Sequence, residues 1–162
     1  MTLSDAFAAA TGAWSGTNGF RLMPADPLAT APATATLTLA AGGSLLTLAY
    51  TWSHPEDGAA DGLLVTGPAV DGFVALWADS WHQQPAPMSM TGRIDDAGEL
   101  LVTGSYAGEW GWRIALAVDG DGLALRMDNV VPASVAGEGD AGPYPVMVCE
   151  LRRPAQPDGD GP

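Results

Sequence analysis

The chain has 162 residues, of which 47% are hydrophobic, and this length suits one domain with a sizeable core. Nineteen acidic residues face six arginines, and the formal net charge is −13. Such a surface repels nucleic acid and anionic lipid, and the absence of lysine excludes Schiff-base chemistry. Because the sequence contains neither a signal peptide nor a long apolar run, we expect a cytoplasmic protein without a membrane or nucleic-acid partner.

The first predicted element is a short helix, Leu3 to Ala10, that covers one end of the fold. A strand follows at about Ala13 to Met23, and a proline-rich loop spans 24–32. Glycine turn signals then recur about every ten residues between runs rich in β-branched and aromatic residues, which is typical of an antiparallel meander. The remaining strands are predicted at 33–40, 44–54, 62–69, 72–81, 87–95, 99–107, 110–118, 122–130 and 144–153.

About ten strands in one domain predict an all-β fold, a single antiparallel up-and-down β-barrel, because an open sheet of that length would leave two unpaired edges. The barrel domain is expected to cover 1–153, and the tail 154–162 to be disordered. Between the last two strands lies Val131 to Pro143, a glycine-rich acidic segment long enough to cover a barrel mouth as a lid.

Alternation along the predicted strands gathers large apolar side chains on one face. If those faces point inward, the lumen is a pocket for a flat or apolar small molecule. In the alternative interpretation, the same rings fill a packed barrel that acts by association, as a homodimer through a sheet face. The predicted ligand-contacting rings are Tyr50, Trp52, Trp77, Trp81, Tyr106, Trp110 and Trp112.

The segment 77–82 carries polar groups between tryptophans. Asp79 or His82 is the candidate hydrogen-bond anchor at the mouth of the pocket. Alternation through 72–81 puts Asp79 on the opposite face from Ser80 and His82, so a Ser–His–Asp relay of these neighbours is not predicted. The alternative function is a small barrel enzyme, a hydrolase, isomerase or cyclase, with His82 or Asp79 as its acid–base group.

Metal binding is not predicted, because the two histidines lie far apart and the carboxylates lack ligand spacing. The acidic turn Asp119–Gly122 is too short for an EF-hand loop. Cys149 has no cysteine to pair with, and its apolar surroundings in sequence predict a buried thiol.

The residues Gly12–Trp14 form a Gly-x-Trp pattern on the first strand, and two arginines stand at the end of the last strand. This combination resembles the calycin superfamily, in which the tryptophan closes the barrel and an arginine packs across its ring. The resemblance implies a plug formed by Gly12, Trp14 and Arg152, or Arg153 in its place. Extended through Gly19, the pattern is similar to nitrobindin-like barrels and related bacterial branches, which have ten strands.

The nitrobindin resemblance implies haem held by a histidine late in the chain, but no histidine follows His82. Haem is therefore disfavoured, and no cofactor is expected. The fatty-acid-binding members imply a carboxylate held by arginine and tyrosine, but no spacing here reproduces their motif. The sequence thus predicts a barrel that binds a small apolar or aromatic molecule without identifying it.

Overall fold

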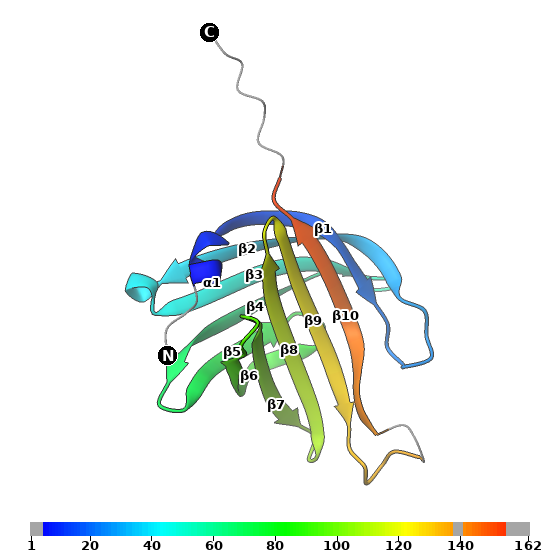
Figure 1. The fold of residues 1–162 in the computed structure, drawn as a ribbon. Coiled ribbons are helices and arrows are strands. Elements are labelled where there is room, and N and C mark those ends of the chain that lie inside the picture. The colour runs from blue at the N-terminus through cyan, green and yellow to red at the C-terminus, as the bar shows by residue number, and fades with distance from the viewer. Residues whose placement is uncertain (1–4, 138–140, 155–162) are drawn as a thin grey trace.

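The computed structural model describes residues 5–137 and 141–154, which form a closed β-barrel (Figure 1). Each strand pairs antiparallel with its neighbours in sequence, and the first strand pairs with the last. The predicted ten-stranded up-and-down barrel is therefore confirmed. The elements are α1 (Asp5–Ala9), β1 (Gly12–Phe20), β2 (Ala29–Ala40), η1 (Ala41–Gly43), β3 (Leu45–His54), β4 (Gly58–Ala69), β5 (Gly72–Asp79), β6 (Gln83–Ile94), β7 (Leu100–Tyr106), β8 (Trp110–Asp119), β9 (Gly122–Val131) and β10 (Gly142–Arg152).

The large apolar side chains at alternating strand positions face the interior of the barrel. Along β3, Leu46, Leu48, Tyr50 and Trp52 are buried, while the residues between them are exposed or half-buried. The same period holds on β5, where every second residue from Phe73 is buried. The large residues of these strands therefore line the interior.

Several strands are longer or shorter than predicted, because cross-strand pairing overrides local sequence. β2 begins at Ala29, four residues earlier than predicted, because residues 29–32 pair with β1; Pro32, for example, lies opposite Thr17. β4 and β6 also begin four residues earlier than predicted. By contrast, β5 ends at Asp79, two residues early, because the Asp79 carboxylate takes up the next backbone N–H groups.

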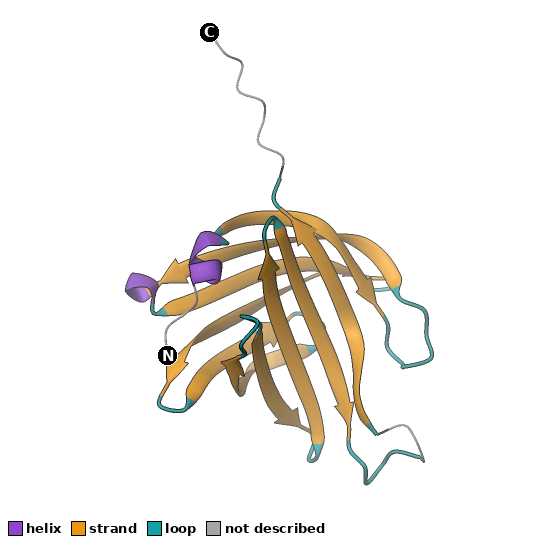
Figure 2. Ribbon diagram, viewed as in Figure 1, coloured by secondary structure: helices purple, strands orange, loops and turns teal. Residues whose placement is uncertain are grey.

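The barrel has two unlike ends (Figure 2). At the closed end, α1 precedes β1, and η1 joins β2 to β3. The other end, here called the mouth, carries the connections 21–28, 55–57, 80–82 and 107–109 and the described residues 132–137 and 141 of the connection between β9 and β10.

Some predictions reach beyond the described residues. Residues 3 and 4 of the predicted helix, residues 138–140 of the predicted lid and residues 155–162 of the predicted tail all lie outside them. The described part of the lid segment contains a turn from Pro132 and a hydrogen bond from Ser134 to Glu109. These contacts do not test whether the segment covers the mouth, and the lid stays a prediction. Neither helix in the described ranges is long and apolar enough to cross a membrane.

The closed end is sealed by the predicted tryptophan. Trp14 is buried against Phe7 of α1, and its Nε1 donates a hydrogen bond to the Ala10 carbonyl at 2.9 Å. The guanidinium of Arg153 lies 4.6 Å from the centroid of the Trp14 ring, a favourable cation–π contact. Arg153 also donates hydrogen bonds to the Thr11 and Ala9 carbonyls. These contacts join the residue that follows the last strand to the first helix and the first strand.

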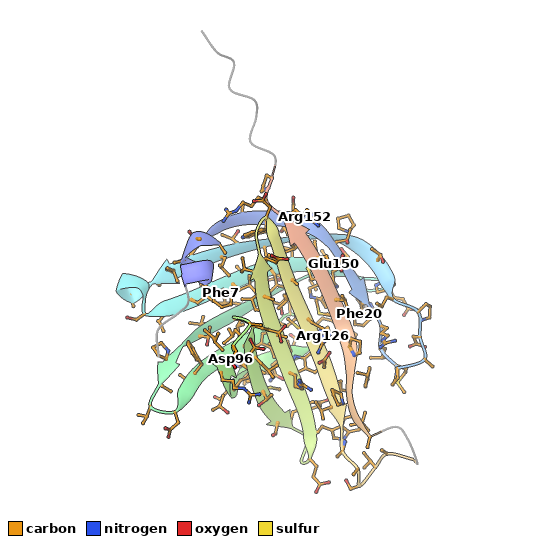
Figure 3. The ribbon with its side chains drawn as sticks, viewed as in Figure 1. Phe7, Phe20, Asp96, Arg126, Glu150 and Arg152 are labelled. Carbon is orange, nitrogen blue, oxygen red and sulfur yellow. The ribbon has the colours of Figure 1, made fainter. Side chains whose placement is uncertain are left out.

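The choice of Arg152 for this role was wrong. Leu151 points into the barrel, so alternation turns Arg152 outward, where it is exposed at the end of β10 (Figure 3). Arg153 follows the last strand residue and folds back over the plug. Gly12 has φ +125°, and a β-carbon there would lie 3.6 Å from Arg153 Nη1. The plug therefore consists of Gly12, Trp14 and Arg153.

Candidate functional site

Asp79 is a buried carboxylate at the mouth end of β5, only 2% exposed. Its Oδ2 accepts hydrogen bonds from Tyr50 Oη at 2.7 Å and from Trp52 Nε1 at 3.1 Å. Its Oδ1 accepts the backbone N–H groups of Trp81 and His82, each at 2.9 Å. Because its partners are all donors, Asp79 acts as an acceptor that holds the 80–82 turn and two aromatic side chains in place.

Tyr50 reaches Asp79 across the intervening strand β4. Gly62 pairs with Tyr50 on one side and with Asp79 on the other, and a β-carbon at Gly62 would overlap the tyrosine ring. The Tyr50 hydroxyl also accepts a hydrogen bond from Trp77 Nε1 at 2.8 Å. Burial, followed by the Asp79 charge, raises the pKa of Tyr50 well above its usual value, so its hydroxyl remains a donor to Asp79.

His82 lies close to Asp79, contrary to the prediction that alternation would separate them. The strand ends at Asp79, so alternation no longer applies, and His82 Nδ1 lies 3.5 Å from Asp79 Oδ1. Ser80 turns away and accepts a hydrogen bond from the Asp61 N–H, so no Ser–His–Asp relay forms. The two acid–base candidates are therefore neighbours, without the serine.

The imidazole of His82 sits in an aromatic cage, and its side chain is 4% exposed. The rings of Trp81, Trp52 and Trp112 lie 4.8, 5.0 and 5.2 Å from it between centroids. Burial lowers the pKa of His82 to about 4, outweighing the opposite effect of the Asp79 carboxylate. The ring is therefore neutral at pH 7, and the nearby carboxylate favours the tautomer with its proton on Nδ1. Nε2 is then an acceptor.

A pocket of about 200 Å³ opens beside this cage at the mouth. One wall is flat, because Trp77 and Trp112 stack at 5.2 Å between centroids with an angle of 10° between their planes. Its lining residues are Leu22, Trp77, Trp81, His82, Met88, Tyr106, Trp112, Asn129, Tyr144 and Val146.

Part of the pocket lining is joined by a linear chain of hydrogen bonds. Tyr106 Oη donates to Asn129 Oδ1 at 2.6 Å, and Asn129 Nδ2 donates to Tyr144 Oη at 3.1 Å. Tyr144 in turn donates to the Leu22 carbonyl at 2.8 Å. This chain fastens the 21–28 connection to β7, β9 and β10, and the polar groups that form it are already paired with one another.

Two other polar side chains that line the pocket are unpaired. Among the described residues, neither ring nitrogen of His82 has a hydrogen-bond partner, and Trp112 Nε1 has none either. The buried amide of Asn18, deeper in the lumen, is unpaired as well. Buried polar groups in native proteins are rarely left unpaired, and such exceptions call for an explanation.

The predicted ligand-contacting residues fall into three groups. Trp77, Trp81, His82, Tyr106 and Trp112 line the pocket. Tyr50, Trp52 and Asp79 belong to the hydrogen-bonded network described above. Trp110 is half-buried beside Tyr106, at 6.3 Å between ring centroids, and is not part of the pocket wall.

Sequence reasoning missed part of the lining. Tyr144 and Val146 alternate on β10 and could have been found from that spacing. Leu22 lies in the connection after β1 and Met88 on β6, and neither stands in a stretch whose alternation marks it as a pocket residue. His54 is a structural residue, because its Nδ1 accepts the Asp57 N–H at 3.0 Å and its ring stacks on Trp81 at 4.6 Å.

A larger hollow of about 650 Å³ lies over the outside of β4–β7. Exposed Val74 and Leu76 form part of it, together with small residues such as Ser89 and Gly104. No titratable or aromatic side chain is among its described lining residues. It is larger than the mouth pocket, and its polar side chains are the hydroxyls of Thr66, Ser89, Thr91, Thr103 and Ser105, without the aromatic wall of the mouth pocket.

The pocket does not fit the haem that the nitrobindin resemblance implies. Drug-sized ligands occupy pockets of about 300–1,000 Å³, and a haem is larger than most of them. A pocket of about 200 Å³ is too small, and both ring nitrogens of His82, through which a histidine ligates haem iron, are buried. Within 5–137 and 141–154, no group of three or more His, Cys, Asp or Glu residues is placed to hold a metal ion.

The predicted burial of Cys149 is confirmed, and the loss of solvation raises the pKa of its thiol to about 12. No protein-family model matches the sequence, and no curated protein matches it.

Proposed function

We propose that this protein is a binding protein that holds a small apolar or aromatic molecule in the mouth pocket. The observation that carries the proposal is the pairing of an aromatic wall with buried polar groups that lack a partner in the described chain. Ligand pockets typically combine apolar and aromatic walls with a few polar groups that fix orientation.

The plug supports kinship with calycin-like barrels, among which many members carry ligands. The contact of Arg153 with Trp14 reproduces the arrangement that the resemblance implies, on a barrel with the expected strand number. We propose this kinship on the closed end alone.

An enzyme that uses His82 or Asp79 is the second candidate, and their 3.5 Å contact is the observation in its favour. Two features make it the weaker one. A histidine with its pKa lowered to about 4 is a poor base at neutral pH. Both oxygens of Asp79 are already engaged by the protein's own donors.

A matched pair of substitutions tests where the ligand binds. Val146→Phe places a larger side chain in the mouth pocket, and Val74→Phe places the same one in the outer hollow. Native mass spectrometry, with and without added neutral aromatic compounds, detects a bound molecule. We expect Val146→Phe to abolish binding and Val74→Phe to retain it.

The reverse pattern would move the site to the outer face of β4–β7. Retention of binding by both folded variants, or the absence of binding to the unmodified protein, would contradict the proposal. Circular dichroism verifies that each variant keeps the barrel.

A further inference from the structure

The two unpaired groups of the pocket wall have opposite hydrogen-bonding character. His82 Nε2 is an acceptor, because the Asp79 carboxylate favours the proton on Nδ1. Trp112 Nε1 is a donor only. The His82 side chain is 4% exposed and Trp112 7% exposed, so bulk water does not satisfy either group. A ligand that supplies both a donor and an acceptor would pair both groups.

The dimensions of the pocket limit the ligand to a small ring system. A cavity of about 150 Å³ is enough for a benzene ring. At about 200 Å³, the mouth pocket suits one ring or two fused rings. The stacked pair Trp77 and Trp112 provides a flat apolar surface against which such rings pack.

The charges around the pocket exclude an anion. No arginine is among the described lining residues, and the chain contains no lysine. The Asp79 carboxylate lies directly behind His82, at 3.5 Å from its Nδ1. A carboxylate ligand would therefore lose its hydration without gaining a counterion.

We infer that the mouth pocket selects neutral phenols of one or two rings, whose hydroxyl donates to His82 Nε2 and accepts from Trp112 Nε1. Both nitrogens are buried, so a ligand reaches them only when the His82 and Trp112 rings turn toward it. A single hydroxyl then satisfies both groups, because it carries one donor and two acceptor lone pairs. This inference deepens the proposed function and rests on it.

The test compares three molecules of nearly the same shape: 2-naphthol, 2-methylnaphthalene and 2-naphthoate. Their dissociation constants are measured at pH 7 by quenching of tryptophan fluorescence. We expect 2-naphthol to bind about tenfold or more tightly than 2-methylnaphthalene, the gain of pairing buried polar groups. The anionic 2-naphthoate should bind most weakly of the three.

Substitutions at the wall identify the residues responsible. His82→Leu should remove the preference for 2-naphthol while 2-methylnaphthalene still binds, whereas His82→Gln, which keeps an acceptor oxygen, should retain part of it. Trp112→Phe should reduce the preference independently. His54→Leu is the matched control, because His54 lies outside the pocket wall and should leave the preference intact.

The outcomes separate this inference from the proposed function. Equal affinities for 2-naphthol and 2-methylnaphthalene would overturn the inference and leave the binding function in place. Tightest binding of 2-naphthoate would overturn it too. If none of the three binds, the proposed function falls together with the inference.

Discussion

The closed end and the mouth of this barrel use the same kinds of residue differently. At the closed end, Trp14 and Arg153 are paired with each other and with backbone carbonyls. At the mouth, His82 and Trp112 are just as buried, yet their polar atoms have no partner in the described residues. The difference teaches that tryptophan and burial alone do not mark a site. We propose that the unpaired polar atoms distinguish a binding surface from one that only holds the fold together.

The largest expected effect comes from breaking the closed end. Trp14→Ala removes the plug and should lower the free energy of unfolding by about 3–5 kcal/mol, because it leaves a large cavity in the core. Denaturant unfolding measures the loss. Binding at the mouth by the folded fraction should be unchanged. A loss below about 1 kcal/mol would contradict the role of Trp14 as the plug.

A smaller loss is expected from Gly62→Ala. The new β-carbon would displace the Tyr50 ring and detach its hydroxyl from Asp79, at a cost of about 2–3 kcal/mol. Thermal and denaturant unfolding report the change.

The control combines Gly62→Ala with Tyr50→Leu. Because the smaller side chain relieves the overlap, the combined loss should be less than the sum of the two single losses. Strict additivity would show that Gly62 is not needed to make room for Tyr50.

The third prediction concerns pH. The pKa of His82 is lowered to about 4 by burial, with Asp79 acting against this and His54 adding to it. Between the usual value of about 6.5 and the lowered one, the unfolded chain binds more protons. His82 therefore contributes its stability above about pH 6.5 and loses it as the pH falls, by about 2 kcal/mol between pH 7 and pH 4.5.

Unfolding curves across that range measure this dependence. His82→Leu should flatten it by about 2 kcal/mol. A slope that His82→Leu leaves unchanged would mean that His82 does not carry a lowered pKa.

The smallest effect distinguishes two adjacent arginines. Arg153→Met should cost about 1–2 kcal/mol, because it removes the cation–π contact and the hydrogen bonds to the plug. Arg152→Met changes an exposed side chain and should stay within about 0.5 kcal/mol. Equal losses in denaturant unfolding would contradict the plug as described.

The fold was largely predictable because turn glycines and two-residue alternation are local signals. Strand ends were less predictable, since β2 and β4 extend by pairing with neighbours rather than by their own propensity. Arg152 was chosen over Arg153 because strand alternation does not predict which way the chain turns after the last strand residue.

The site was predictable in part. The rings on β5 and β8 follow from alternation, and they line the pocket through Trp77 and Trp112. The approach of His82 to Asp79 depends on a strand that ends early, and that end depends on tertiary hydrogen bonds to Tyr50 and Trp52. Such a contact needs three-dimensional information.

The most direct test of the binding function follows the indole N–H signals by nuclear magnetic resonance while 2-naphthol is added. Trp→Phe variants assign the six tryptophan signals. The account predicts shifts at Trp77, Trp81 and Trp112, which line the pocket, and none at Trp14 in the plug. No shift at a saturating concentration, or shifts that spare the three mouth tryptophans, would contradict it.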